Sequence, residues 1–376
     1  MKIVILSPAY PYRGGIAAFT ERLATEYVRQ GNDVEIVTFT LQYPSFLFPG
    51  KTQYSDAPAP KELKISRMLS SVNPISWIKT GRKIRSLRPD MLIVAHWMSF
   101  MVPSLATVCR IVRRNRHTRI VALVHNMLPH EQHFFDKPLA AYFAKSVDAF
   151  ASMSNLVMND IALFDTAKPR VCSPHPLYDH YGDIIGRDEA LRMLGLSANE
   201  RYALFFGFIR EYKGLDLLID AFADHRLFDL GVKLIVAGEF YGDPQPHIDR
   251  IKRLDLTDRI ILCNDYIPDP EVNRYFCAAD CVVLPYRSAT QSGITQTAMY
   301  FERPMIATNV GGLPDIVHDG ETGLVVNVDA QSIADALVRF FRDGLADQLS
   351  AKVREEKKKY AWSNFVEAVN SLIPNK

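Results

Sequence analysis

Cysteine is scarce in this sequence, and its distribution excludes the common disulfide and zinc scaffolds. The 376 residues include five cysteines, none of them in a CxxC pair, and an odd, scattered set suits reduced thiols. Cys277 and Cys281 lie four residues apart, but no histidine or further cysteine stands nearby to complete a zinc site. An Asp-x-Asp pair, which often holds a divalent cation, is also absent. We therefore expect a reduced protein that requires no metal.

The sequence also lacks a convincing membrane span and a secretion signal. The one candidate span, 91–109, is long enough to cross a bilayer, but it contains His96, Ser99 and Pro103. We therefore predict a buried strand at 91–95 that runs into a loop. The first six residues lack the cationic start, long apolar stretch and cleavage site of a signal peptide. The sequence thus predicts a cytoplasmic protein.

Charge is distributed unevenly along the chain. Residues 1–180 carry 22 Lys and Arg against 13 Asp and Glu, whereas 181–376 carry 22 against 29. The basic residues gather in 61–88 and 110–119, and apolar residues are interleaved with those of 61–88. Two interpretations stay open: a solvated helix face, or peripheral contact with the anionic inner face of a membrane. No nucleic-acid-binding motif accompanies the charge, so we expect no nucleic acid partner.

Apolar strands, glycine turns and helical patterns follow one another in two series. The stretch Lys2–Ser7 is apolar without alternation, which indicates burial on both faces in a parallel sheet. A glycine turn at Gly14 and Gly15, a helical pattern at 18–30 and a second strand at 33–39 come next. A series of the same kind begins at 202–207.

Two tandem series predict an α/β protein with two Rossmann-like, doubly wound domains that face each other across a cleft. We place the first domain at 1–180 and the second at 181–359. The stretch 173–186 is the expected linker, because its residues suit neither helix nor strand. The C-terminal segment 360–376 has an apolar helical face, and we expect it to return and pack on the first domain.

Two cations and a helix start in the second half indicate a phosphate-binding site. The span from Gly207 to Gly214 follows a strand and contains Arg210 and Lys213. The stretch 291–294 opens a helix after a glycine turn, and the free amides and macrodipole of a helix start favour an anion. The alternative is a pair of surface cations in a loop. Their position at the end of a strand favours a diphosphate site.

With these motifs, residues 202–326 resemble the C-terminal domain of the family 4 retaining glycosyltransferases of GT-B fold, the group 1 type. The two-domain layout extends the resemblance over nearly the whole chain. Lys213 matches the family's phosphate-binding lysine, but Phe208 stands where the family has arginine, and Arg210 is the expected substitute. The family's paired glutamates, eight positions apart, align with Ala289 and Thr297. Their contacts with the donor sugar and the ribose therefore cannot be transferred as acids.

The resemblance implies site residues in both domains. The donor-binding residues would be Gly14, Gly15, Tyr266, Ile267, Gln291, Ser292, Gly293, Ile294 and Thr297. The catalytic residues would be His125, Arg210 and Lys213, and the acceptor side would include His96 and Asn126. Simpler roles stay open for several of these: a satisfied structural histidine for His96 and His125, a core residue for Tyr266, and a packing helix for Thr297.

The function that the resemblance implies is transfer of a sugar from a nucleotide diphosphate sugar to an acceptor hydroxyl with retained anomeric configuration. The acceptor would be a glycan or a lipid-linked glycan in polysaccharide or cell-envelope biosynthesis, and the basic first half favours a lipid-linked or polyanionic one. No carboxylate stands out as the nucleophile of a double displacement. We therefore expect same-face attack inside the closed cleft, with no cofactor and no metal.

Two alternatives belong to other classes. Because both glutamates are missing, the chain could be a non-catalytic relative that keeps the fold and acts as a binding or assembly component. The retained Lys213, Arg210 and 292–293 turn argue against that interpretation. A dinucleotide-dependent oxidoreductase is disfavoured, because Gly14 and Gly15 lack the full G-x-G-x-x-G spacing.

Overall fold

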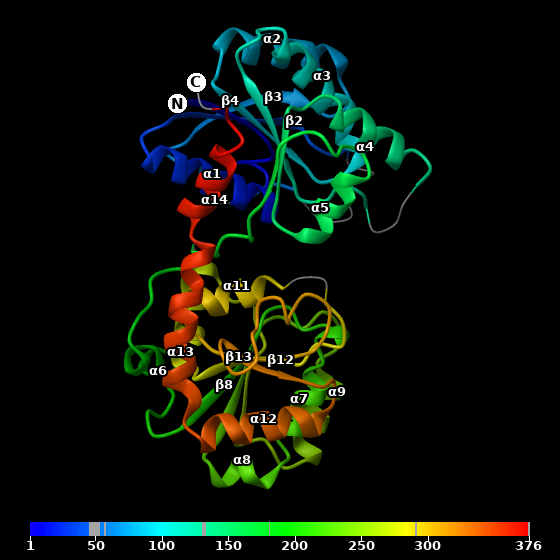
Figure 1. Ribbon diagram of the computed structural model, residues 1–376. Helices are drawn as coiled ribbons and strands as arrows, with labels where there is room; N and C mark the ends of the chain where they lie inside the picture. The colour runs from blue at the N-terminus through cyan, green and yellow to red at the C-terminus, as the bar shows by residue number, and fades with distance from the viewer. Residues whose placement is uncertain (45–52, 56–57, 130–132, 180, 290–291, 375–376) are drawn as a thin grey trace. The chain divides into compact units, whose positions relative to one another are not determined.

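The computed structural model describes residues 1–44, 53–55, 58–129, 133–179, 181–289 and 292–374 (Figure 1). The chain divides into two compact units: the first comprises Met1–His175 and Ala361–Lys376, and the second comprises Pro176–Tyr360. The boundary predicted at 180 and the observed one between His175 and Pro176 both lie in the expected linker, 173–186. Each unit holds one parallel sheet with helices on both faces, so the prediction of two doubly wound α/β domains is confirmed.

The first unit is built on seven parallel strands in the order β3-β2-β1-β4-β5-β6-β7. The strands are β1 (Lys2–Leu6), β2 (Asp33–Leu41), β3 (Lys64–Ser70), β4 (Met91–His96), β5 (Arg119–Val124), β6 (Ala149–Ser152) and β7 (Arg170–Cys172). The chain moves outward from β1 to β3 and returns to β4 on the other side of β1. The carboxyl ends of β1 and β4 therefore flank the switch point where open α/β sheets bind ligands.

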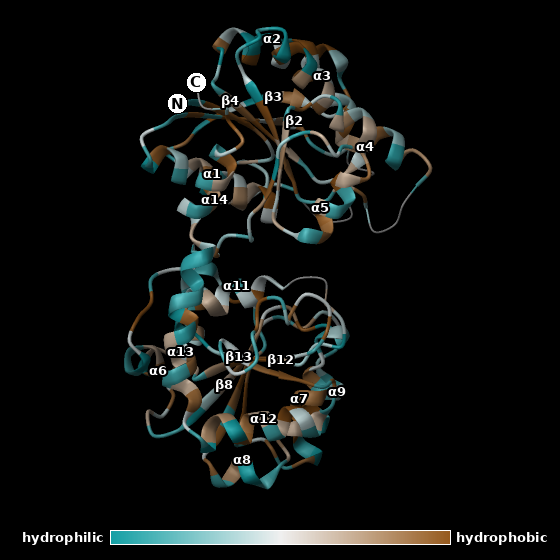
Figure 2. Ribbon diagram, in the orientation of Figure 1, coloured by the Kyte–Doolittle hydropathy of each residue, from teal (hydrophilic) through white to brown (hydrophobic). Residues whose placement is uncertain are grey.

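Helices bury both faces of this sheet. They are α1 (Gly15–Arg29), α2 (Pro74–Leu87), α3 (Val102–Arg113), α4 (Asp136–Ala144), α5 (Asn155–Ala162) and α14 (Trp362–Asn370), with a short 3₁₀ turn, η2 (Ser99–Met101). Alternate residues of β1 serve the two faces: Val4 and Leu6 pack in the core under α2 to α5, while Ile3 and Ile5 pack under α1 and α14. Figure 2 shows the result as apolar strands beneath helices with hydrophilic outer faces.

The C-terminal helix α14 lies beside α1, at the opposite end of the sequence (Figure 1). The ring of Phe365 meets that of Phe19 edge to face at 5.5 Å between centroids. The hydroxyl of Tyr27 donates to Asn370 at 3.2 Å. The C-terminal segment thus completes one face of the first unit's core.

The second unit is built on six parallel strands in the order β10-β9-β8-β11-β12-β13. The strands are β8 (Arg201–Phe206), β9 (Val232–Ala237), β10 (Ile260–Cys263), β11 (Cys281–Leu284), β12 (Met305–Thr308) and β13 (Gly323–Val326). The helices are α6 (Arg187–Leu194), α7 (Leu215–Ala221), α8 (His225–Asp229), α9 (Gln245–Arg253), α10 (Val272–Ala278), α11 (Gly293–Tyr300), α12 (Ala330–Arg342) and α13 (Leu345–Glu356). Three 3₁₀ turns complete it: η3 (Glu211–Lys213), η4 (Asp269–Glu271) and η5 (Lys357–Tyr360). Here the switch point lies between β8 and β11.

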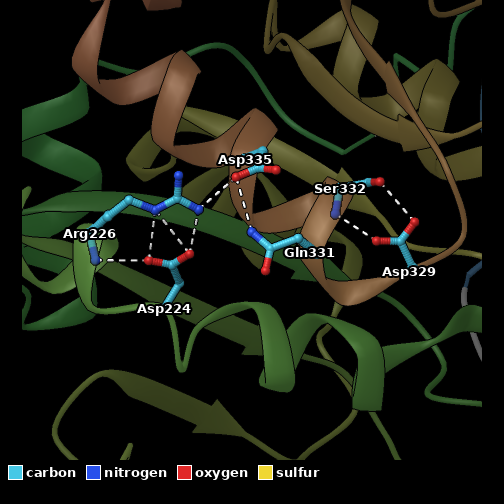
Figure 3. Close-up of polar contacts among 6 residues, drawn as sticks. All are labelled: Asp224, Arg226, Asp329, Gln331, Ser332 and Asp335. Carbon is cyan, nitrogen blue, oxygen red and sulfur yellow. Dashed lines mark hydrogen bonds and ion pairs between the residues drawn. The ribbon is translucent and has the colours of Figure 1, made fainter.

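Charged side chains join α8 to α12 in this unit (Figure 3). The carboxylate of Asp224 caps α8 by accepting from the backbone N–H of Arg226 at 2.9 Å. The guanidinium of Arg226 binds that carboxylate and also donates to Asp335 of α12 at 2.6 Å. Asp329 caps α12 by accepting from the N–H of Ser332 at 2.7 Å. These contacts fix the start of each helix and the distance between the two.

Two segments singled out in the sequence have these bounds in the first unit. The strand expected at 91–95 is confirmed as β4, and the loop after it is limited to 97–98, because η2 begins at Ser99 and α3 at Val102. Pro103 stands in the first turn of that helix, where proline costs no hydrogen bond. The basic segment 61–88 forms β3 and α2, and Leu69 and Ile84 belong to the core. Of the residues described, no helix has the length and hydropathy needed to cross a membrane.

We predict that the contact between α14 and α1 is a major source of stability in the first unit. Phe365 is 1% exposed, so Phe365→Ala should lower the free energy of unfolding by about 3–5 kcal/mol through lost burial and the cavity left behind. Glu367→Ala, an exposed change on the same helix, should shift it by less than about 0.5 kcal/mol. Denaturant unfolding of the full chain measures both, and equal effects would contradict the prediction.

Candidate functional site

The candidate site is a pocket of about 390 Å³ in the second unit. Its walls come from the segments that follow β8, β9, β10 and β11, and from the start of α11. The lining residues are Tyr181, Phe206, Gly207, Phe208, Tyr212, Lys213, Gly238, Glu239, Tyr266, Ile267, Asp269, Val272, Tyr286, Ser292, Gly293 and Ile294. The pocket therefore lies at the carboxyl edge of the sheet and spans the switch point, the expected ligand position for this topology.

Two glycines shape the loop that brings a lysine into this pocket. Gly207 has φ 94°, and a Cβ there would lie 3.2 Å from both the Nζ of Lys213 and the Cδ1 of Ile294. Gly214 has φ 66°, and a Cβ there would lie 2.0 Å from the carbonyl oxygen of Pro285. Only glycine fits these backbone positions. The loop can therefore fold onto the strand ends and hold the Lys213 ammonium against α11.

Lys213 is a desolvated cation without a carboxylate partner in the described part of the chain. Lys213 is 7% exposed, and its ammonium lies 5.7 Å from the ring centre of Tyr286. Burial, reinforced by the charge of Arg210, lowers the pKa of Lys213 to about 8. A buried, unpaired ammonium costs free energy, which an anion bound beside it would recover. The pocket is thus electrostatically prepared for an anionic ligand.

Arg210, expected beside Lys213, takes a different position. It is exposed and lies outside the pocket lining, and its guanidinium stacks on the ring of Tyr241 at 4.3 Å. It is still close enough for its charge to lower the pKa of Lys213. The structure therefore brings Lys213 to the pocket surface and leaves Arg210 as a nearby source of positive potential.

The start of α11 forms the second anion-binding element. Ser292 is its N-cap residue, Gly293 is its first residue, and no side chain of a described residue caps its amides. Both residues line the pocket, and the hydroxyl of Ser292 lies 3.4 Å from that of Tyr286. The free N–H groups and the macrodipole add positive potential beside Lys213. Gln291, expected here as well, lies outside the described residues.

Ala289 and Thr297, which stand at the positions of the two missing carboxylates, are not among the residues that line the pocket. Thr297 is 2% exposed, and its hydroxyl donates to the carbonyl of Gly293 at 3.0 Å. The backbone of Ala289 packs tightly against Gly311: a Cβ on Gly311 would overlap the carbonyl oxygen of Ala289. The hydroxyl hydrogen of Thr297 is therefore already used within the helix, and the structure does not bring this residue into the pocket.

The segment that follows β10, the strand at one edge of the sheet, contributes an aromatic region to the pocket. Tyr266 and Ile267 follow β10, which lies two strands away from β8 in the sheet. Tyr266 is 61% exposed, so it is not a core residue. Tyr181 lies nearby: burial, followed by the charge of Asp269, raises its pKa to about 12. The pocket thus has cationic and aromatic regions, which suit the diphosphate and the base of a nucleotide.

Two histidines of the first unit meet at the carboxyl edge of its own sheet. His96 ends β4, and its carbonyl accepts from the N–H of His125, which follows β5, at 2.8 Å. The ring of His96 stacks on Phe143 at 4.4 Å, while Asn126 is exposed. Among the described residues, the Nε2 of His125 is buried without a hydrogen-bond partner, and the ring of His96 is buried beside the backbone of Met127.

These two histidines are neutral at pH 7. Burial lowers the pKa of His96 to about 4. Burial, and then the charges of His175 and His96, lowers the pKa of His125 to about 3. A neutral imidazole both donates and accepts hydrogen bonds, so the pair can bind a hydroxyl group but carries no charge for an anion.

The glycine turn of the first unit stands at the start of α1. Gly14 is the N-cap residue with φ 116°, and the helix has no side-chain cap. A Cβ added to Gly14 or Gly15 would meet no described atom within 4 Å. Backbone conformation therefore requires glycine at Gly14, and the start of α1 is open to solvent or ligand.

A larger cavity of about 500 Å³ lies between α7, α8 and α12 of the second unit. Its walls include Asp220, Asp224, Arg226 and Gln331. The guanidinium of Arg226 is already bound by Asp224 and Asp335 (Figure 3). Asp220 pairs with Arg250. The pocket at the strand ends is the better candidate, because its cation has no such partner.

Sequence reasoning found the glycines and Lys213 but missed much of the pocket wall. The missed lining residues are Tyr181, Phe206, Tyr212, Gly238, Glu239, Asp269, Val272 and Tyr286. Gly238 and Tyr286 follow apolar strands of the second series, as Gly207 does, so their position was a usable signal. Tyr181 comes from the expected linker, and no sequence pattern connects it with the strand ends.

Comparison with known proteins gives two family matches that together span most of the chain. The model described as glycosyl transferases group 1 matches residues 200–343. The model described as Glycosyltransferase Family 4 matches residues 13–179. The two matched ranges correspond to the second and first units.

Curated relatives and a solved structure agree with these matches. D-inositol 3-phosphate glycosyltransferase 1 of Catenulispora acidiphila is 29% identical over 76% of this chain and 71% of its own length. A D-inositol 3-phosphate glycosyltransferase of Corynebacterium aurimucosum is 30% identical over 42% of this chain, a match that spans only 38% of that protein. The structure of Anabaena HepE in complex with UDP is 15% identical, with a TM-score of 0.69 over 99% of each chain. The predicted GT-B fold is confirmed.

We predict that Lys213 lowers the stability of the unliganded protein at neutral pH. Its pKa falls from 10.5 to about 8 on folding, so the penalty is complete below pH 8 and disappears as pH rises to 10.5. Lys213→Met should therefore raise the free energy of unfolding at pH 7 by about 1–3 kcal/mol, and the gain should shrink by pH 10.

Denaturant unfolding at pH 7 and pH 10 measures this effect. Lys252→Met, an exposed lysine in the same unit, should change stability little at either pH. A Lys213→Met protein that is less stable than the wild type at pH 7 would show that the ammonium is stabilised by the fold.

Proposed function

Since the chain belongs to the family 4 glycosyltransferases, we propose that it transfers a sugar from a nucleotide diphosphate sugar to the hydroxyl of an acceptor and retains the anomeric configuration. The observation that carries the proposal is the buried ammonium of Lys213 beside the uncapped start of α11. A diphosphate leaving group gains negative charge as the glycosidic bond breaks, and both elements are aimed at that charge.

The donor would lie along the pocket from the aromatic region to the cationic one. The base would pack against Tyr266 and contact the segment at Ile267. The diphosphate would accept hydrogen bonds from Lys213 and from the amides at Ser292 and Gly293. Anabaena HepE, with the same fold, has been solved in complex with UDP, which supports a nucleotide in this fold but leaves the base of this chain's donor open.

The transfer would proceed on one face of the sugar. The bond from the anomeric carbon to the β-phosphate oxygen breaks, and the acceptor oxygen forms its bond from the same side. The acceptor proton passes to the departing phosphate oxygen, so no protein carboxylate has to act as a nucleophile. Lys213 and the α11 amides stabilise the charge on the departing diphosphate, which is the main catalytic contribution assigned to the second unit.

The first unit would bind the acceptor and the donor sugar through neutral groups. The neutral ring of His96 and the Nε2 of His125, which has no hydrogen-bond partner among the described residues, would bind hydroxyls. Asn126 is exposed directly after His125, and the start of α1 at Gly14 and Gly15 is open. These residues occupy the carboxyl edge of the first sheet, the usual ligand position in such a domain.

We place the acceptor among glycans or lipid-linked glycans that carry a phosphate or another anionic group. Two similar proteins are named D-inositol 3-phosphate glycosyltransferases, and an inositol phosphate is anionic. The excess of basic residues in 1–180 has the matching sign. Polysaccharide or cell-envelope biosynthesis would supply such acceptors.

Peripheral contact with an anionic membrane from the cytoplasmic side is part of the proposal. In α2, Ile75 and Ile78 are 63% and 41% exposed, and Lys79, Arg82 and Lys83 lie on the same helix. Exposed isoleucines beside cations suit the surface of an anionic bilayer. The other large apolar residues of α2, Trp77, Ile84 and Leu87, belong to the core or pack against it, so the contact would be small and salt-sensitive.

A donor panel tests the proposed reaction. Purified protein should cleave at least one of the common UDP-, GDP-, ADP- or dTDP-sugars when an anionic glycan acceptor is present, as measured by nucleoside diphosphate release. Lys213→Gln should lower kcat/KM by about 10²–10³, because it removes one donor to the transition-state charge. Lys252→Gln is the matched control. A folded wild-type protein that neither binds nor cleaves any donor would favour the non-catalytic assembly component.

We also predict that the reaction is independent of divalent metal. Lys213 and the amides of α11 supply positive charge to the diphosphate, and the sequence has no Asp-x-Asp pair to hold a cation. Turnover of the active donor should therefore change less than about twofold when EDTA replaces Mg²⁺ or Mn²⁺ in the assay. Loss of activity in EDTA that is restored by one of these ions would contradict this part of the proposal.

A further inference from the structure

The start of α4 carries two phenylalanines on the surface of the first unit. Phe134 is 92% exposed, more than any other large apolar side chain that the structure describes, and Phe135 is 41% exposed. Their rings meet edge to face at 5.3 Å between centroids, so the two side chains form one apolar group. Folding leaves this group in water, and its burial against a partner would be favourable.

Cations surround this apolar group. Lys137 and Lys145 are exposed, one on α4 and one directly after it, and the guanidinium of Arg110 on α3 lies 3.7 Å from the ring centre of Tyr142 on α4. The acid of α4, Asp136, is 2% exposed, and its carboxylate already accepts a backbone hydrogen bond at 2.6 Å. The exposed charge that α4 carries is therefore positive.

The same sign of charge extends over the neighbouring helices. Helix α3 packs against both α2 and α4, so the three helices form one layer over the sheet (Figure 1). The sequences of α2 and α3 contain no acid, and their cations are Lys79, Arg82, Lys83, Arg85, Arg110 and Arg113. Arg113 is paired with Asp148 at 2.8 Å. The remaining excess of positive charge attracts an anionic surface.

A second apolar group stands at the start of α2. Val72, Ile75 and Ile78 are 49%, 63% and 41% exposed. In a parallel sheet the connecting helices run back against the strand direction, so the starts of α2 and α4 both lie toward the carboxyl edge. Two apolar groups therefore lie along one edge of a cationic helix layer.

The chemistry of the two apolar groups favours one class of anionic partner. Phenylalanine rings could stack on the bases of a nucleic acid, but the aliphatic side chains at the start of α2 could not, whereas the acyl boundary of a bilayer accepts both kinds. We propose that Phe134 and Phe135 insert into the interface of an anionic lipid bilayer, with the cations of α2, α3 and α4 against its headgroups. This inference rests on the membrane contact in the proposed function, and it places the main anchor at the start of α4.

The anchor has a consequence for the first unit's candidate site. His96 and His125 lie at the carboxyl edge of the sheet, the same edge to which the starts of α2 and α4 belong. Insertion of those helix starts would hold this edge near the lipid surface. A lipid-linked acceptor could then reach the two histidines without leaving the bilayer.

Vesicle co-sedimentation of the full chain tests the anchor. Vesicles of phosphatidylcholine alone are compared with vesicles in which about one third of the lipid is phosphatidylglycerol. The wild type should bind the anionic vesicles at least about 10-fold more strongly, and added salt should weaken that binding. Changing Phe134→Ser and Phe135→Ser together should lower the partition coefficient on anionic vesicles about 10- to 100-fold, because the inserted apolar area is lost.

Matched variants separate insertion from loss of structure. Phe134→Trp keeps a large aromatic ring that suits the membrane interface and should retain binding. Phe228→Ser changes a 67% exposed phenylalanine on α8 of the second unit and should have no effect. Thermal melting of each variant checks that it is folded. The double serine variant should also bind nucleoside diphosphates as the wild type does, because the donor pocket lies in the second unit.

The outcomes separate the anchor from the proposed reaction. Equal vesicle binding by the wild type and the double serine variant would overturn the anchor and leave the contact to α2. A wild-type protein that binds neither kind of vesicle would overturn the membrane contact altogether, while sugar transfer is judged by the donor panel. Tighter binding to a random single-stranded RNA than to anionic vesicles would also overturn the anchor and identify the layer as a nucleic-acid surface.

Discussion

The site depends on one electrostatic arrangement: a buried ammonium that has no counter-ion among the described residues and lies beside a helix start that none of their side chains caps. Lys213 reaches this position because Gly207 and Gly214 let their loop fold onto the strand ends. Burial lowers the pKa of Lys213, so the empty pocket is less favourable than the same pocket with an anion in it. This cost in the unliganded state would favour a bound anion such as a diphosphate.

The two sheets place their functional groups by the same topological rule. In each unit the strand order reverses beside the first strand, at β1 and β4 or at β8 and β11, and the candidate ligand groups stand at the carboxyl ends nearby. Their chemistry differs between the units. The first offers the neutral His96 and His125, suited to hydroxyls, whereas the second offers Lys213 and helix amides, suited to phosphate. This division matches an acceptor substrate and a charged donor.

Local sequence predicted the features that depend on neighbouring residues. The buried strands, the α/β class and the loop from Gly207 to Lys213 were all visible, because an apolar run or a glycine turn carries its own signal. A feature set by distant packing was not visible: Tyr181 joins the pocket from the linker. Pro103 carries an ambiguous signal, because proline suits both loops and the first turn of a helix.

The central claim is that the second unit binds a diphosphate through Lys213 and the backbone amides at the start of α11. A crystal structure of the full chain with its preferred nucleoside diphosphate tests it most directly. The account predicts phosphate oxygens within hydrogen-bond distance of the Nζ of Lys213 and of the backbone N–H of Gly293, with the base against Tyr266. A diphosphate bound elsewhere, with the ammonium of Lys213 still unpaired, would contradict it.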